Sequence, residues 1–370
     1  MENSFICKLI CDNPDSWKDI CEDKLIRVKL DENTPYAIFN YQINADFFDP
    51  IVQEARGIII DTEIVDVVCF PFKKFGNFGE PYVDTIDWTT ARVQEKVDGS
   101  IVKLWFDKRN GVWVWSTNSC IHASEASTQS GRNFQSIINS TPEFKYLKSN
   151  EDTLNKNYTY IFELVSPDNQ IVIRYSEARL CHLGTRDNVT GRELDIGIGI
   201  NKPKEYPLHS LEACKKAVTE LNKGDFPDAE GFVVVDANWH RIKVKSPEYL
   251  VWHHAVNNGI LDKDTAYDLV YSDDFNFELF KDNVSPYIVD RMTFYIGEFE
   301  IVKKKIVAMV LFARELRDNG LSRKDIALKI KDSLYSFYGF KGLDNGENPD
   351  DLIKVLGKSH FLKVVPEYTE

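Results

Sequence analysis

The segment Gln94–Ser100 (QEKVDGS) holds a lysine that is placed to act as a nucleophile. A strand-like run leads into it, another follows, and Gly99 permits a sharp reversal, so we expect Lys96 at a turn between two strands. A lysine amine has an ordinary pKa of about 10.4 and attacks only after losing its proton, which neighbouring cations or desolvation promote. Taken alone, the segment also fits a surface hairpin with a solvated lysine.

Two glutamates and two lysines further along the chain could complete such a site. Glu163 lies near the end of one apolar run, and Glu230 begins another. Lys243 and Lys245 are two residues apart and would therefore share one face of a strand. Each alone fits a charge at a strand end or edge. As a set they supply two acids for sugar or metal contacts and a cation pair able to hold a polyphosphate.

The elements that must position these side chains change in type along the chain. Apolar runs rich in β-branched and aromatic residues predict strands at 101–106, 112–115, 158–162, 232–235 and 241–245. Helical spacing is predicted near 123–139 and at 210–222, and then at 287–317, at 322–336 and after Asn348-Pro349. The pattern predicts an α+β fold, with a strand-rich domain over 1–254 and an all-α C-terminal domain over 255–370.

Length and charge restrict the class of protein. A chain of 370 residues fits two domains, since single cores stop growing at roughly 250–300 residues. The composition is that of a soluble globular protein, and no apolar run approaches the roughly 20 residues that span a bilayer. A net charge of −13 argues against indiscriminate nucleic-acid binding, so any phosphate-binding cations must be few and local.

The cysteines and the N-terminus indicate a cytoplasmic protein. The seven cysteines are odd in number and form no Cys-x-x-Cys, which argues against a disulfide framework or structural zinc. The first residues lack the basic start and long apolar stretch of a secretory signal. We therefore expect reduced thiols and no membrane partner.

In order and spacing, these residues resemble the motifs of covalent nucleotidyltransferases, the group of polynucleotide ligases and mRNA capping enzymes. Lys96–Gly99 matches motif I, Phe162-Glu163 motif III, Glu230-Gly231 motif IV and Lys243–Lys245 motif V. The N-terminal domain is accordingly expected to have the ligase-type nucleotidyltransferase fold with antiparallel sheets.

Further segments narrow the resemblance to the bacteriophage RNA ligase 1 family. Six segments are similar to signatures of that family. They are Tyr36–Tyr41 (its Tyr signature), Glu54–Ile58 (Arg-Gly), Pro71–Asn77 (Lys-Phe), Ser166–Val172 (the extended motif III), Thr185–Gly191 (motif IIIa) and Ser246–Tyr249 (after motif V). The likeness covers about 36–255 and is weak over the helical remainder.

The resemblance implies an ATP-dependent RNA ligase that works in three steps. Lys96 would attack the α-phosphate of ATP, release pyrophosphate and become lysyl-AMP. The AMP would pass to an RNA 5′-phosphate, and an RNA 3′-hydroxyl would then displace it and seal the strand. The implied cofactors are ATP and Mg²⁺, with Mn²⁺ as a substitute.

The resemblance also assigns roles to single residues. ATP binding is assigned to Tyr41 (aromatic nucleotide contact), Arg56 and Lys74 (phosphate-binding cations), Glu163 (ribose hydroxyl), and Lys243 and Lys245 (phosphate charge). Glu230 would serve the metal-dependent steps. Asp98 would orient the site, although an Asp before Gly is also a good turn former. Arg56, Lys74, Lys96, Lys243 and Lys245 are expected to converge on one cleft.

Four further positions come from the resemblance. Tyr249 matches a functional tyrosine after motif V, while His253 fits function and packing equally well. Asp273 and Asp274 resemble a metal-binding acidic pair, with a helix cap or solvated turn as the alternative. Asn118 departs from the pattern, because relatives usually carry Arg or Lys there, in motif Ia. This leaves open how the nucleotide or 5′-phosphate is held at that point.

The expected partner is single-stranded or nicked-loop RNA. Family precedent suggests the repair of broken tRNA anticodon loops, with the helical domain recognising the tRNA and the protein acting as a monomer, in the host cytoplasm if phage-encoded. No Gly-x-x-x-x-Gly-Lys-Ser/Thr occurs, so a separate polynucleotide kinase/3′-phosphatase is predicted.

Two other functions fit part of this pattern. A capping guanylyltransferase, like a DNA ligase, should carry a β-rich oligonucleotide-binding module after motif V, where the pattern here is helical. A ligase-derived, non-catalytic RNA-binding protein is disfavoured by the intact Lys96, the two glutamates and the motif V lysines.

Overall fold

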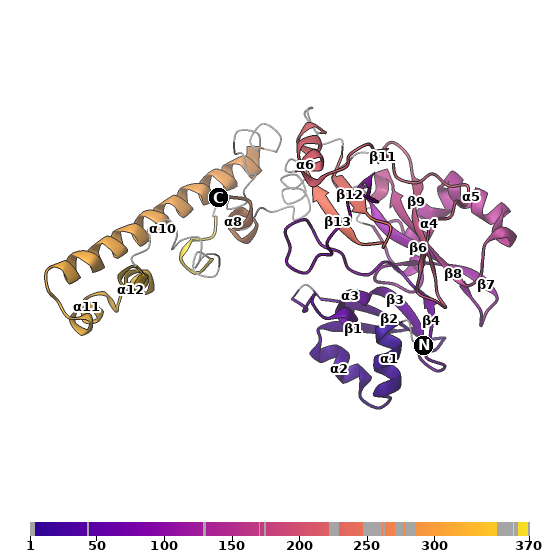
Figure 1. Ribbon diagram of the computed structural model, residues 1–370, viewed down its shortest axis with the longest axis horizontal. Helices are drawn as coiled ribbons and strands as arrows, with labels where there is room; N and C mark the ends of the chain where they lie inside the picture. The colour runs from indigo at the N-terminus through magenta and orange to yellow at the C-terminus, as the bar shows by residue number, and fades with distance from the viewer. Residues whose placement is uncertain are drawn as a thin grey trace. The chain divides into compact units, whose positions relative to one another are not determined.

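The computed structural model of the chain describes residues 4–42, 44–128, 131–169, 171–173, 175–221, 229–246, 261, 263–270, 277, 286–345, 358 and 362–368. The chain divides into two compact units, Met1–Leu250 and Val251–Glu370. Figure 1 shows the elements of each unit with their labels. The assignment of nucleotide chemistry to 1–254 and RNA recognition to 255–370 stays a prediction.

A four-stranded antiparallel sheet with three helices begins unit 1. Its strands, in the order β1-β2-β3-β4, are β1 (Ile26–Leu30), β2 (Tyr36–Tyr41), β3 (Arg56–Asp61) and β4 (Asp66–Cys69). The helices are α1 (Phe5–Asp12), α2 (Trp17–Asp23) and α3 (Pro50–Glu54). They share a buried apolar cluster with the sheet, which includes Ile6, Trp17 and Phe39. The sequence analysis predicted none of these helices.

Two further antiparallel sheets carry the segments that resemble ligase motifs. The second sheet has the order β10-β9-β8-β6-β7, with β6 (Ser100–Asp107), β7 (Val112–Thr117), β8 (Tyr158–Val165), β9 (Arg179–Asp187) and β10 (Glu193–Leu194). The third has the order β11-β5-β12-β13, with β5 (Arg92–Glu95), β11 (Glu205–Tyr206), β12 (Gly231–Val235) and β13 (Arg241–Lys245). All five predicted strands are present, and the mixed α/β fold with antiparallel sheets is confirmed.

Two helices were predicted in unit 1, near 123–139 and at 210–222, and the second of them is present. The remaining helical elements are η1 (Ala123–Glu125), α4 (Phe134–Ser140), α5 (Pro142–Ser149), η2 (Glu151–Thr153), η3 (Pro167–Asn169) and α6 (Leu211–Glu220). α6 is confirmed, and its N-cap Ser210 accepts a hydrogen bond from the Ala213 amide. The continuous helix predicted near 123–139 is wrong, because Ser127 and Asn133 form a β-bridge around a turn that contains Gly131 at φ +82°.

The described part of unit 2 contains helices and no strand. They are α8 (Lys263–Val270), α10 (Pro286–Asp318), α11 (Arg323–Ile330) and α12 (Ser336–Asn345), and α8, α10 and α12 share a core that includes Tyr267, Tyr295 and Tyr338. The predicted helix 287–317 is confirmed as α10. The one predicted over 322–336 ends at Ile330, and a separate helix begins at Ser336. The helix predicted after Asn348-Pro349 lies outside the described residues.

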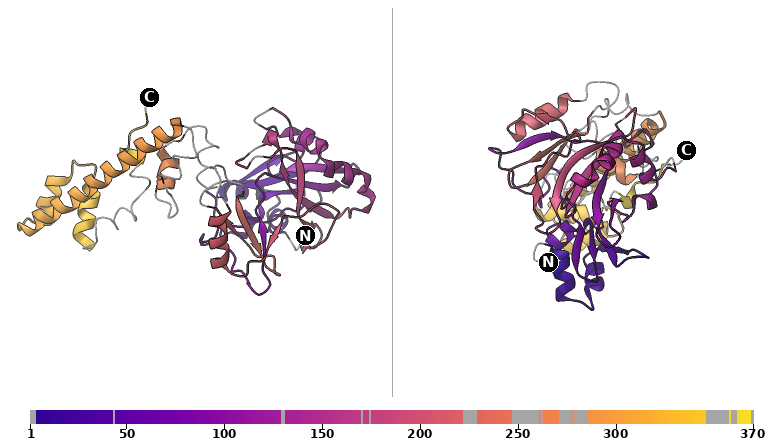
Figure 2. Two further views of the ribbon diagram at one scale, coloured as in Figure 1. Left: turned by 90° about the horizontal axis from the view of Figure 1, so that it is seen from above. Right: turned by 90° about the vertical axis from the view of Figure 1, so that its right-hand side faces the viewer.

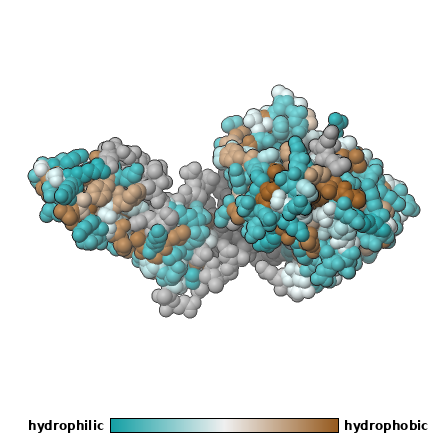
Figure 3. All heavy atoms as spheres, turned by 90° about the horizontal axis from the view of Figure 1, so that it is seen from below, coloured by the Kyte–Doolittle hydropathy of each residue, from teal (hydrophilic) through white to brown (hydrophobic). Residues whose placement is uncertain are grey.

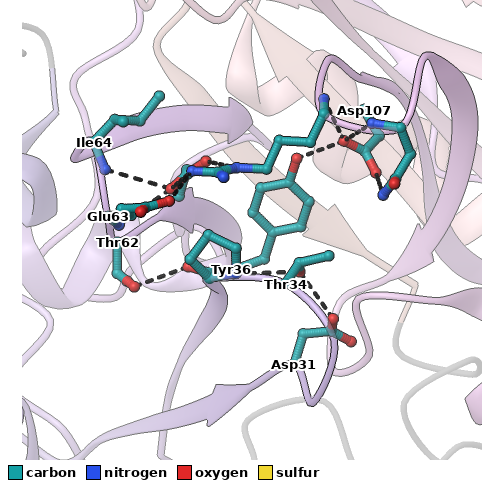
Figure 4. A network of polar contacts seen from close by, with 11 residues as sticks. Asp31, Thr34, Tyr36, Thr62, Glu63, Ile64 and Asp107 are labelled. Carbon is teal, nitrogen blue, oxygen red and sulfur yellow. Dashed lines mark hydrogen bonds and ion pairs between the residues drawn. The ribbon is translucent and has the colours of Figure 1, made fainter.

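One face of β6 packs against the first sheet. The views in Figure 2 show the indigo N-terminal part and the magenta part of unit 1 side by side. Trp105 is fully buried there and packs edge-on against Tyr36 of β2, at 5.6 Å between ring centroids. The Tyr36 hydroxyl donates to Asp107 at 2.5 Å. After β6, Arg109 donates to both carboxylate oxygens of Asp61, at the end of β3, at 2.6 and 3.0 Å. Figure 4 shows this polar network, which fixes β3 against β6.

The surface mixes hydrophilic and apolar residues, as the face in Figure 3 shows. None of the seven cysteines, all within the described part of the chain, forms a disulfide. Among the described helices, none has both the length and the apolar character needed to cross a bilayer.

Candidate active site

A cavity of about 640 Å³ in unit 1 gathers many of the residues singled out from the sequence. Side chains from the second and third sheets line it, together with Arg56 of β3 and the residues after β7. Five predicted residues lie in its wall, namely Arg56, Lys96, Asn118, Glu163 and Lys243. The sequence motifs thus meet at one site, although up to 187 residues separate them, from Arg56 to Lys243.

Lys96 stands where the chain crosses from the third sheet to the second. β5 ends at Glu95 and pairs with β11 and β12, whereas β6 begins at Ser100 and pairs with β7 and β8. The segment is therefore a crossover between sheets and not a hairpin. Gly99 serves close approach rather than a special dihedral, since a Cβ there would lie 2.4 Å from the Leu164 carbonyl oxygen. The Lys96 amide donates to the Gly231 carbonyl at 2.9 Å.

Glu230 pairs with two lysines. Its side chain is 3% exposed; one carboxylate oxygen pairs with the Lys96 ammonium and the other lies 3.0 Å from Nζ of Lys245. Gly231, which follows, has φ +141°, and a Cβ there would lie 2.2 Å from the Val244 carbonyl oxygen. Glycine is thus required for β12 to approach β13. Glu230 therefore holds Lys96 and Lys245 as ion pairs.

Cations crowd the side of the cavity around Lys243. Burial, together with the positive charges of Arg56, Lys74, Lys96 and Lys245, lowers the pKa of Lys243 to about 7. The Phe75 ring lies between two of these groups, 5.0 Å from the Arg56 guanidinium and 5.0 Å from the Lys243 ammonium. Of the five predicted cations, Arg56, Lys96 and Lys243 line the cavity, and the charges of Lys74 and Lys245 also act on Lys243. An anionic ligand would relieve the repulsion among these charges.

Glu163, on β8, is the buried acid of the cavity. Burial raises its pKa to about 8; Lys96 opposes this shift and Glu230 adds to it. At neutral pH the free protein therefore holds Glu163 in its protonated form, which can donate a hydrogen bond as well as accept one.

Comparisons with known proteins identify the family. The model of the phage RNA ligase 1 family, described as "RNA ligase", matches residues 54–249, more than half of the chain. The chain belongs to this RNA ligase family. Every residue of the cavity wall lies within this match.

Sequence identity to the individual relatives below is 28% or less. A viral protein named "Putative bifunctional polynucleotide kinase/RNA ligase", from Autographa californica nuclear polyhedrosis virus, is 28% identical over 305 residues, covering 75% of this chain and 42% of the relative. The RNA ligase of Rhodothermus phage RM378 is 25% identical over 280 residues, covering 58% of this chain and 63% of the relative. The chain thus spans less than two thirds of either relative. A solved archaeal ATP-dependent RNA ligase is 12% identical with a TM-score of 0.43, over 79% of this chain and 78% of that one.

Five predicted residues of this RNA ligase family member are not in the cavity wall: Glu230 and Lys245, which pair with each other, and Lys74, Tyr41 and Asp98. Lys74 places its ammonium 5.3 Å from the Tyr41 ring centroid and 4.7 Å from that of Phe47. Tyr41 interacts with Arg56. Asp98 is 3% exposed, and its Oδ2 accepts hydrogen bonds from the amides of Val172 and Ile173 at 2.9 and 2.7 Å. These contacts anchor the loop after β8, and a catalytic role for Asp98 stays a prediction.

Of five further residues taken from the family pattern, the structure describes only Asn118. Tyr249, His253, Asp273 and Asp274 lie outside the described residues. Asn118 lies in the cavity wall, and its buried Oδ1 has no hydrogen-bond partner in the described part of the chain. This departure from the family pattern therefore places an unpaired acceptor at the site. A cluster of possible metal ligands, Asp31, His122 and Glu125, lies outside the cavity wall.

Two cations of this family member were missed from the sequence. Arg241 lies in the cavity wall, 4.3 Å from the Phe72 ring centroid, and pairs with Glu193 at 2.6 Å. The alternation that selected Lys243 and Lys245 includes Arg241 and could have revealed it. Lys103, on β6, is fully buried and donates a hydrogen bond to the Gly57 carbonyl.

Replacing Glu163 with Gln should stabilise the free protein, by an amount that grows between about pH 4.5 and pH 8. The wild-type folded state holds this proton up to about pH 8, whereas the unfolded chain releases it near its ordinary pKa of 4.5. Wild-type stability therefore falls over this range by up to about 1.4 kcal/mol per pH unit, and glutamine does not titrate. Denaturation midpoints at pH 5, 6.5 and 8 test this, with the exposed Glu212→Gln as control. Parallel curves for Glu163→Gln and wild type would contradict it.

Proposed function

We propose that this chain is an ATP-dependent RNA ligase with a nucleotidyltransferase fold, which joins a 5′-phosphate to a 3′-hydroxyl through lysyl-AMP and RNA-adenylate. The observation that carries the proposal is the position of Lys96, in the wall of a cavity that also holds Arg56, Lys243 and the buried acid Glu163. A nucleophilic amine among cations, in a member of an RNA ligase family, fits attack on a nucleoside triphosphate.

In the first step, a bond forms between Nζ of Lys96 and the α-phosphorus of ATP, while the bond from that phosphorus to the bridging oxygen breaks. Pyrophosphate leaves with the electron pair. Lys96 must first leave its ion pair with Glu230 and transfer a proton to water, because an ammonium has no lone pair. Arg56 and Lys243 line the cavity and would neutralise the phosphate charge.

The donor set of the site fits a divalent cation that arrives with the triphosphate. Mg²⁺ would supply further charge neutralisation, and Mn²⁺ would substitute for it. Glu95 and Glu163 are the carboxylates in the described cavity wall, and Glu230 becomes a candidate ligand once a lysine releases it. Asp273 and Asp274 stay proposed ligands from the family pattern.

The proposed substrate is broken single-stranded or nicked-loop RNA, with tRNA repair as the proposed role. The name of the viral relative combines a polynucleotide kinase with an RNA ligase. It supports the proposal that a kinase/3′-phosphatase prepares the ends that this chain would seal. We further propose that unit 2 recognises the RNA, that Tyr249 acts in ligation, and that the protein works as a monomer in the cytoplasm.

Incubation of the full chain with Mg²⁺ and α-labelled ATP or GTP tests the proposed chemistry. We expect protein-bound label from ATP, with release of pyrophosphate, and sealing of 5′-phosphorylated single-stranded RNA in preference to the same DNA sequence. Label from GTP alone would indicate a capping-type enzyme. Absence of label from both nucleotides would favour a non-catalytic RNA-binding protein.

A further inference from the structure

Lys103 is a charged residue inside a central strand. It lies on β6, opposite Ser116 of β7 and Ile161 of β8, and its relative exposure is 0%. Lysine is almost never fully buried without a partner, because removing an ammonium from water is costly. Here Nζ donates a hydrogen bond to the Gly57 carbonyl oxygen at 2.5 Å. The contact crosses from the second sheet to the first.

Gly57 is the extra residue of a β-bulge. The β2–β3 register pairs Phe39 with Ile58 and Asn40 with Arg56, which leaves Gly57 between them without a partner in the ladder. Its φ is +82°, as expected where a bulge needs a glycine. A Cβ at this position would lie 2.6 Å from the Asn118 carbonyl oxygen and 2.8 Å from Nζ of Lys103. The bulge is therefore held between Lys103 and the cavity residue Asn118.

The bulge places Arg56, the residue before it, in the cavity wall. Arg56 donates to the Lys73 carbonyl at 3.3 Å and lies over the Phe75 ring. The buried ammonium of Lys103 cannot attract a guanidinium, since both are cations. It can position Arg56 through the peptide group of Gly57, whose carbonyl it fixes.

We propose that Lys103 is a positioning residue for the nucleotide: by holding the Gly57 carbonyl, it fixes the bulge that presents Arg56 to the phosphates. This inference rests on the proposed ATP chemistry. Arg109 provides a comparison, because it also joins β6 to β3, but at the far end of β3, through Asp61. A loss of general sheet contact would affect both positions alike, whereas Lys103, unlike Arg109, contacts the peptide group next to Arg56.

The test compares the initial rate of adenylylation against ATP concentration in wild type, Lys103→Met and Arg109→Met. Methionine keeps the length of the lysine side chain and removes its charge and donors. We expect Lys103→Met to raise the KM for ATP by about tenfold, the equivalent of a lost charged hydrogen bond, while the rate at saturating ATP changes less than about twofold. Arg109→Met should leave KM unchanged even if it lowers the melting temperature.

A double-mutant cycle shows whether the effect passes through Arg56. In an Arg56→Ala background, Lys103→Met should add less than about twofold to KM, because no guanidinium remains to be positioned. Independent, multiplying effects would overturn the proposal, as would an unchanged KM in folded Lys103→Met or an equal rise in Arg109→Met. If Lys103→Met does not fold, Lys103→Leu, which also lacks a charge and a donor, takes its place under the same criteria. Absence of adenylylation in wild type would instead refute the proposed function.

Discussion

Lys96→Ala should abolish the transfer of label from α-labelled ATP to the protein and, with it, the sealing of 5′-phosphorylated RNA. The expected loss is at least about a thousandfold, because the covalent intermediate cannot form without the attacking nitrogen. Lys96→Arg should be equally inactive, since a guanidinium keeps its proton at accessible pH. Gel detection of labelled protein measures the first step directly.

Two controls separate this result from a loss of folding. Lys108→Ala, at an exposed position after β6, should label like wild type. Supplied with RNA that already carries a 5′-adenylate, Lys96→Ala should still seal, because that substrate enters after the lysine has acted. Label on Lys96→Ala would mean that another residue is the nucleophile. Failure to seal adenylated RNA would show that Lys96 is needed beyond the first step.

Lys243→Met should move activity and stability in opposite directions. We expect the adenylylation kcat/KM to fall by about 100- to 1,000-fold, because a buried cation that faces the phosphates is lost. At pH 7 the folded protein should gain about 1–3 kcal/mol, because burial and four neighbouring cations disfavour the charge that methionine removes.

The pH dependence gives the sign of this effect. The folded pKa of Lys243, about 7, lies below its ordinary value of 10.5, so the unfolded chain binds more protons between these values. The cost of the charge is thus full below pH 7 and disappears as the pH rises towards 10.5, and the stabilisation by methionine should fade over the same range. Urea unfolding at pH 6.5 and 9 measures it, with exposed Lys215→Met as control. A destabilised Lys243→Met would show that Lys243 is held by favourable contacts.

Site residues could be predicted from the sequence when a charged side chain stood in or beside a strand with a clear apolar pattern. Glu163, Lys243 and Lys96 lie in or beside regular strands, whose ends and faces follow from apolar patterning. A glycine was correctly expected to matter at position 99, but for its backbone freedom at a sharp reversal. The actual reason is the close approach of Leu164, which depends on the pairing of β6 with β8. Such tertiary contacts leave no local pattern.

Lys103 shows where sequence reasoning stopped. It interrupts the apolar run Ile101–Phe106, which was predicted to be a strand, and a lysine inside such a run was itself a signal. Its partner is a single carbonyl of a bulge 46 residues away, which no spacing rule identifies. The N-terminal helices were missed for a different reason: each has eight or fewer residues, too short for a clear periodicity.

The polar network of Tyr36, Asp107, Arg109 and Asp61 limits how the protein can be dissected. A fragment that began just before motif I would lack β2 and β3, and would leave Asp107 without its tyrosine, Arg109 without Asp61 and the Trp105 ring exposed to water. The residues up to the end of β4 therefore cannot be removed without the loss of these contacts. Any minimal enzyme built from this chain has to retain them.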